Sequence, residues 1–136
     1  RALKIINDSK EKNIKFYELN KYHIEQLKDH PILYKRIYHI ISENNRVMLM
    51  RQALVNGDLD LIGDILNKSH VSLSRDYQVS CNEIEAIIQI SKKHKGFYGG
   101  RIMGGGFGGC CICLVKNSQK VCKTNFNVKI YEGDSL

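Results

Sequence analysis

Apolar residues recur at spacings of three and four from residue 32 to 55, and this period predicts one long amphipathic helix. Pro31 stands just before the segment, and proline favours the first position of a helix. Asn56-Gly57 supplies a left-handed stop, and Asp58 is a suitable N-cap for a second helix over residues 59–70. The two segments together predict a helical hairpin.

Shorter segments flank this hairpin. Residues 2–12 and 17–29 are candidates for short helices. Ser80 and Glu83 have the spacing of a capping box, and we expect them to open a helix over residues 83–93.

The pattern changes to that of strands in the last third of the chain. Residues 97–103 and 110–116 predict two strands, and apolar residues alternate with polar ones along a third, at 126–130. Helices come first and strands later, which favours the α+β class. We expect the hairpin and short helices to pack on a small antiparallel sheet, in a single domain covering residues 1–136.

Length and composition indicate the size of the core and the compartment in which the protein works. The chain has 136 residues, of which 43% are hydrophobic, so it can bury a core of useful size. No apolar run approaches the roughly 20 residues that a membrane-spanning helix needs. No signal-peptide pattern opens the chain, and its five cysteines form no secreted disulfide framework. We therefore expect a cytoplasmic protein without a membrane partner.

The formal charge of +7 raises nucleic acid and other polyanions as partners. The lysines are scattered along the chain and form no basic motif, so we expect no nucleic-acid partner. Cys110 and Cys113 have the spacing of half a zinc site, but no second pair follows, and strand residues three apart face opposite ways. We expect buried, inert cysteines and no metal site.

Five of the eleven glycines gather between the two predicted strands, at Gly104, Gly105, Gly106, Gly108 and Gly109. Their spacing matches a dinucleotide-binding fingerprint, but a strand follows where that motif needs a helix. No Gly-Lys-Ser/Thr sequence of a phosphate-binding P-loop is present either. Missing Cβ atoms allow a backbone or a phosphate to approach closely. Glycine content alone leaves a flexible surface loop as an equal alternative.

The sequence around the glycines, YGGRIMGGGFGGCCICLV, resembles the third conserved motif of galactokinases, in the GHMP kinase superfamily. Residues 66–88 are similar to a second conserved segment of that family, and His39, Glu43 and Arg46 are similar to its long-helix pattern. The positions that match in the glycine motif are Tyr98, Gly99, Arg101, Gly104, Gly105, Gly106, Phe107, Gly108, Gly109 and Cys110. Together these segments cover most of residues 36–116.

The resemblance implies a ferredoxin-like GHMP kinase C-terminal domain. It also implies ATP-dependent phosphorylation of galactose at the anomeric hydroxyl, giving galactose 1-phosphate, with ATP and Mg²⁺ as cofactors. The family's sugar-binding, nucleotide-binding and catalytic patterns belong to its N-terminal half, and none of them occurs here. We expect this chain to be the C-terminal half, inactive alone and without a catalytic residue. Its expected partner is the N-terminal half, which would hold most contacts to ATP, Mg²⁺ and galactose.

Within that frame, Gly104, Gly105, Gly106, Gly108 and Gly109 are expected to form one wall of the active-site cleft, close to the phosphate groups. Ser69, His70 and Arg101 are expected to support this loop. A histidine titrates near neutral pH, but a helix-borne His70 satisfied by a neighbour is preferred to a catalytic one. Arg75, Asp76 and Arg101 could also pair with one another or face a ligand.

The chain departs from the family pattern at several positions. Met103 replaces a small hydroxyl residue at the entrance of the loop, and such a side chain removes a hydroxyl and crowds a phosphate. The other departures are Gly100, Asn82, Glu85 and Cys111. Two alternatives therefore stay open: a sugar kinase acting on N-acetylgalactosamine or arabinose, and a non-catalytic sugar sensor that contacts a regulator.

Overall fold

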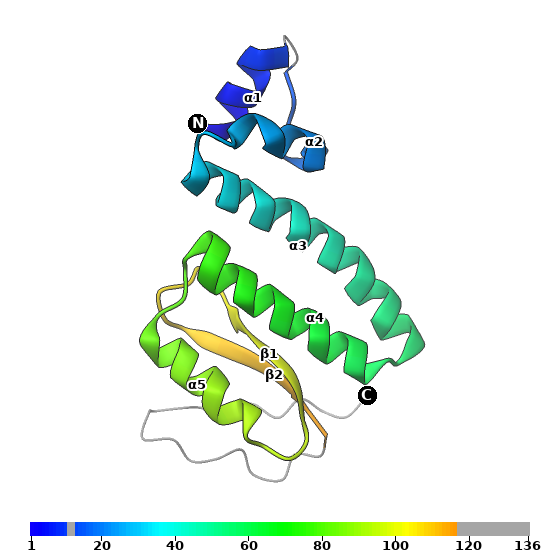
Figure 1. Ribbon diagram of the computed structural model, residues 1–136. Coiled ribbons are helices and arrows are strands. Elements are labelled where there is room, and N and C mark those ends of the chain that lie inside the picture. The colour runs from blue at the N-terminus through cyan, green and yellow to red at the C-terminus, as the bar shows by residue number, and fades with distance from the viewer. Residues whose placement is uncertain (11–12, 117–136) are drawn as a thin grey trace.

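The computed structural model describes residues 1–10 and 13–116, which form helices followed by a two-stranded sheet (Figure 1). The helices before the sheet lie along the chain in this order: α1 (Ala2–Lys10), η1 (Phe16–Glu18), α2 (Lys21–Ile24), η2 (Glu25–Leu27), α3 (Pro31–Asn56), α4 (Leu59–Ser72), the π-helical turn η3 (Leu73–Tyr77) and α5 (Asn82–Lys92). The strands are β1 (Phe97–Met103) and β2 (Cys110–Val115). Among these residues no helix is both long and apolar enough to cross a bilayer.

The predicted hairpin is confirmed as α3 and α4, which run side by side (Figure 1). Pro31 occupies the first turn of α3. Gly57 ends the helix with a φ of 64°, a conformation that glycine adopts without a steric cost. Asp58 then caps α4, because its carboxylate accepts a hydrogen bond of 3.0 Å from the Leu61 amide.

The short helices before α3 pack against its first turns. The predicted helix over 2–12 is present as α1, whereas the segment 17–29 divides into η1, α2 and η2. The core of this region consists of Ala2, Ile6, Leu19, Ile24, Leu27 and Ile37. A second core, nearer the sheet, consists of Ala53, Ile62 and Ile65. The long helix α3 therefore carries one apolar cluster at each end.

The predicted capping box at the start of α5 is wrong. Cys81 is the N-cap of this helix and no side chain caps it, so Glu83 stands one position too early to be the partner in a box. The Ser80 hydroxyl donates instead to Glu85 Oε1 at 2.6 Å. The expected helix itself is present over nearly the predicted range.

The strands β1 and β2 pair antiparallel, with Arg101 opposite Ile112 and Met103 opposite Cys110. Helices α4 and α5 contact β1 from its two faces, since Gly99 approaches Gly63 of α4 and Gly100 approaches Ile88 of α5. This arrangement confirms the α+β class with a helical hairpin on an antiparallel sheet. The third predicted strand, at 126–130, lies outside the described residues.

Helix α4 approaches β1 so closely that both elements must present bare backbone. A Cβ on Gly99 would lie 1.9 Å from the Gly63 carbonyl oxygen, and a Cβ on Gly63 would lie 2.4 Å from that of Tyr98. Asn67 fixes the register of the contact: its side-chain nitrogen donates to the Tyr98 carbonyl at 3.2 Å, and its oxygen accepts from the Gly100 amide at 3.1 Å. Two glycines and one amide side chain thus set the distance between helix and sheet.

The replacement Gly99→Ala should therefore destabilise the fold. The added methyl group meets main-chain atoms that cannot rotate away, and we expect a loss of about 2–3 kcal/mol, the upper range for overpacking. Denaturant unfolding measures it. Gly105→Ala is the control, because a Cβ there has nothing within 4 Å in the described part of the chain. Equal unfolding midpoints for the two variants would contradict the close approach.

Candidate functional site

The glycine loop, residues 104–109, connects β1 to β2 and needs its glycines for different reasons. All of its residues except Gly105 have positive φ, from 58° at Phe107 to 131° at Gly108. Backbone of this kind is strained for any residue with a Cβ. Gly105 has no such requirement.

The loop touches the described chain at Val79. A Cβ on Gly106 would lie 2.5 Å from the Val79 Cβ and 2.6 Å from its carbonyl oxygen. The same carbonyl accepts a hydrogen bond of 2.7 Å from the Phe107 amide. By contrast, a Cβ on Gly104, Gly105 or Gly108 would meet no described atom within 4 Å. One side of the loop is thus packed, and the other presents open backbone.

Ser69 and Arg101, two of the predicted loop supports, meet at a single carboxylate, that of Glu43 in α3. The Ser69 hydroxyl donates to Glu43 Oε2 at 2.9 Å, and Arg101 Nη1 donates to the same oxygen at 3.1 Å. Arg46 Nε donates to Glu43 Oε1 at 2.5 Å. Burial alone would raise the pKa of Glu43, but the hydrogen bonds from Arg46 and Ser69 and the two guanidinium charges outweigh it and lower that pKa.

His70, the third predicted support, lies beside Glu85 of α5. Its side chain is 5% exposed, and its Nε2 is 3.3 Å from Glu85 Oε1 without the angle of a hydrogen bond. Glu85 is thus the neighbour at ion-pair distance, but neither ring nitrogen of His70 has a hydrogen-bond partner among the described residues, so the expected satisfied histidine is not observed. Burial favours a raised pKa for Glu85, yet hydrogen bonds from Ser80 and from other neighbours hold that pKa below its usual value. The His70 ring thus faces a carboxylate.

Sequence reasoning missed the central position of Glu43. It matched Glu43 to a family pattern, but the partners lie 26 and 58 residues further along the chain, at Ser69 and Arg101. The Asp76 carboxylate, for which pairing with Arg75 or Arg101 is one predicted alternative, accepts from the Ser72 hydroxyl at 2.9 Å. No local spacing indicates the pairs of Glu43 with Ser69 and Arg101, because they form only when α3, α4 and β1 pack together.

The cysteines differ in exposure. Cys111 and Cys113 are half-buried, and burial raises the pKa of both thiols, to about 11 for Cys111. These two therefore stay protonated near neutral pH. The prediction of burial is wrong for Cys110, which is exposed where β2 leaves the loop. Residues 1–10 and 13–116 contain no group of three metal-ligating side chains, and the absence of a metal site stays a prediction.

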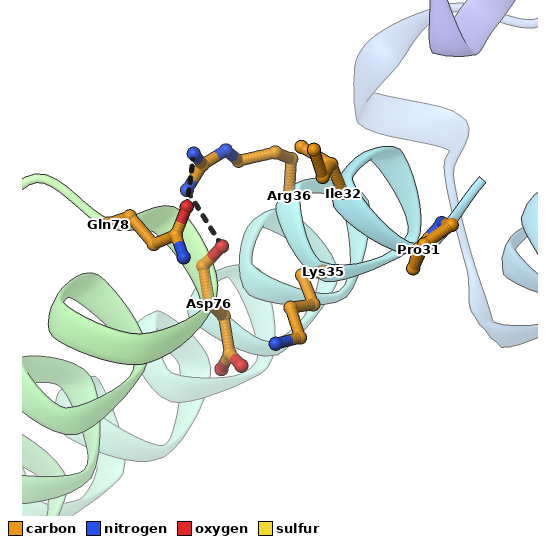
Figure 2. Close-up of a pocket in the computed structure, with 6 residues that line it drawn as sticks. All are labelled: Pro31, Ile32, Lys35, Arg36, Asp76 and Gln78. Atoms are coloured by element: carbon orange, nitrogen blue, oxygen red, sulfur yellow. Dashed lines mark hydrogen bonds between the residues drawn. The ribbon is translucent and has the colours of Figure 1, made fainter.

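A shallow pocket of about 80 Å³ lies where the start of α3 meets the end of η3 (Figure 2). Its lining residues are Pro31, Ile32, Lys35, Arg36, Asp76 and Gln78. Arg36 crosses the pocket, with one nitrogen donating to the Asp76 carbonyl and another to Gln78 Oε1, both at 2.9 Å. This contact ties α3 to the segment that leads to Val79.

The described chain is thus a helical hairpin on a small sheet, with a glycine loop that is open on one side. Residues 50–123 match the family described as GHMP kinases C terminal. The chain belongs to this family.

Two bacterial galactokinases are similar to this chain in sequence. The chain is 45% identical to the galactokinase of Enterococcus faecalis over 85 residues, which are 62% of this chain and 22% of the relative. It is 43% identical to that of Thermotoga neapolitana over 101 residues, 74% of this chain and 28% of the relative. The resemblance to galactokinases is therefore confirmed.

The fold of a solved relative is similar as well. The crystal structure of Lactococcus lactis galactokinase complexed with galactose matches with a TM-score of 0.73 at 36% identity. The match covers 84% of this chain and 30% of that one. This chain thus spans less than a third of the length of these relatives.

The Glu43 cluster predicts a pH-dependent loss of stability in Glu43→Gln. Two arginines lose their carboxylate partner, and we expect a loss of about 1.5–3 kcal/mol in the free energy of unfolding, the range for hydrogen bonds to charged groups. Because the folded pKa lies below the unfolded value of 4.5, this contribution is present above pH 4.5 and is lost as pH falls through the folded pKa. Denaturant unfolding at several pH values measures the difference.

Asp64→Asn provides the matched control for this prediction. Asp64 pairs with Lys68 on the exposed face of α4, where an ion pair contributes only about 0–1 kcal/mol. A loss in Glu43→Gln no larger than that of the control, or one that persists unchanged at low pH, would contradict the role assigned to Glu43.

Proposed function

We propose that this chain is the C-terminal part of a galactokinase, whose complete protein uses ATP to phosphorylate galactose at the anomeric hydroxyl. The observation that supports the proposal best is the glycine loop. It lies at the position of the family's third motif, and its open face carries backbone without side chains at Gly104, Gly105 and Gly108. Such a surface accommodates a phosphate or a second backbone at close range.

In this proposal the chain contributes to phosphoryl transfer by positioning. Phosphoryl transfer depends on alignment and charge stabilisation more than on covalent chemistry by the protein, so a wall of the cleft contributes without a base of its own. ATP and Mg²⁺, implied by the family, would be held mainly by the N-terminal half, together with galactose. The chain alone is then inactive. ATP supplies the transferred phosphoryl group, and the loop restricts where that group can lie.

Ser69, His70 and Arg101 act in this proposal as supports at a distance. Arg101 stands three residues before the loop, and its hydrogen bond to Glu43 ties the end of β1 to α3. Ser69 holds the same carboxylate from α4. His70 braces the start of α5 through Glu85. The cytoplasm remains the proposed location, and the free cysteines of the described residues suit a reducing compartment.

A coupled assay on the intact protein tests the proposed activity. With galactose and MgATP we expect ADP and galactose 1-phosphate in equal amounts. Preference for N-acetylgalactosamine or arabinose would identify a related kinase instead. Binding of galactose and ATP without turnover would favour the sensor. That alternative is supported by Met103, which is exposed at the loop entrance where the family has a small hydroxyl residue.

Gly105→Val tests the proposed wall. The described chain leaves open space at Gly105, and the residue has no positive φ, so the fold should tolerate valine. A nucleotide or a backbone segment that packs on Gly105 from outside this chain would clash with valine. We therefore expect kcat/KM to fall by at least about a hundredfold, which corresponds to a loss of about 2.7 kcal/mol in transition-state stabilisation. Steady-state kinetics and thermal unfolding of the intact protein measure both effects. Unchanged activity with normal stability would remove the close contact from the proposal.

A further inference from the structure

The packed side of the glycine loop depends on a segment that is itself held in place. Phe107 and Gly106 contact Val79. The Val79 amide in turn donates to the Leu73 carbonyl at 3.1 Å, across the π-helical turn η3. The position of the loop is therefore only as well defined as the position of residues 73–79.

Arg36 of α3 fixes the residues immediately before Val79 (Figure 2). Its Nη1 donates to the Asp76 main-chain carbonyl and its Nη2 to Gln78 Oε1, both at 2.9 Å. The guanidinium carbon also lies 5.5 Å from the centre of the Tyr77 ring. One side chain thus contacts three successive residues, and it does so with a planar fork that lysine cannot reproduce.

The backbone on both sides of the Val79–Phe107 hydrogen bond is unusual. Gln78 has φ 60° and Phe107 has φ 58°, and neither is a glycine. Left-handed backbone at such residues persists where surrounding contacts over-determine it, and it concentrates at functional sites. The π-turn that precedes Gln78 is a second feature of that kind. Strain on both sides of one hydrogen bond indicates that this contact needs external support.

A second tie from α3 reaches the same turn. His39, one turn beyond Arg36, stacks on Tyr77 with ring centres 4.7 Å apart. Its Nδ1 is 3.0 Å from the Ser72 hydroxyl, which donates to Asp76. His39 therefore contacts both ends of the turn, through Ser72 and Tyr77. Arg36 contacts only its end and is the α3 residue that reaches Gln78, next to Val79.

We propose that Arg36 is a positioning residue for the glycine loop, acting through Gln78 and Val79 on Phe107. Loss of the guanidinium frees the left-handed Gln78, lets the Val79 carbonyl turn away, and releases the loop from its packed side. The consequence for phosphoryl transfer rests on the proposed function. The structural consequence does not, and it can be measured separately.

Hydrogen–deuterium exchange on the intact protein tests the structural part. In Arg36→Ala we expect the peptide containing Phe107 to exchange at least about tenfold faster, the order expected for losing charge-assisted hydrogen bonds. Arg36→Lys should not restore protection, because an ammonium group cannot bridge both acceptors. Lys35→Ala, which removes an exposed cation from the same pocket, should stay within about twofold of the wild type.

Kinetics supply the functional part. We expect kcat/KM for ATP to fall about tenfold in Arg36→Ala while KM for the sugar changes less than twofold, a split that general unfolding does not produce. If Arg36→Ala does not fold, Gln78→Gly is the second variant. It removes the side-chain oxygen that accepts from Arg36 and keeps the left-handed backbone, and it should accelerate amide exchange in the peptide containing Phe107.

Unchanged exchange at residues 104–109 in both variants overturns the proposal, whatever the kinase activity. Full rescue by lysine also overturns it, since charge alone would then suffice. If the intact protein phosphorylates no sugar, the proposed function fails, and the exchange experiment still decides the role of Arg36.

Discussion

The contact between Gly63 of α4 and Gly99 of β1 is the constraint on which the rest of the structure depends. It brings a helix and a strand to main-chain contact, a distance that any side chain at either position would prevent. At this distance Asn67 can bond on both sides of Gly99, and Ser69 and Arg101 can meet at Glu43. The polar cluster is therefore a consequence of the packing.

Contacts on two sides fix the position of the glycine loop. From the sheet side, β1 is fixed by α4 and by the Glu43 cluster, which reaches Arg101 three residues before the loop. From the other side, Val79 holds Gly106 and Phe107, and the segment before Val79 is held by α3. Helix α3 thus anchors both supports, through Glu43 near its middle and Arg36 near its start. A long rigid helix suits this task because it joins the two points without a hinge.

Sequence patterns predicted the parts of this arrangement that are local. The hairpin follows from apolar periodicity, the Asn56-Gly57 stop and the Asp58 cap, and all three signals act within a few residues. The capping box failed although it is also a local signal, because Glu85 takes the hydroxyl of Ser80. The partners of Glu43 had no local signal at all. Gly63 illustrates the difference: within a helical pattern a glycine indicates weakness, and only the strand packed against it gives the reason.

The glycine motif could likewise be located from sequence but not divided into its parts. Five glycines look alike on paper, yet in the structure Gly106 is required by Val79, Gly104, Gly108 and Gly109 by their positive φ, and Gly105 by neither. The described chain thus gives no structural reason for a glycine at position 105. The proposal of a functional wall therefore rests on Gly105, which the described fold does not require to be glycine, more than on the number of glycines around it.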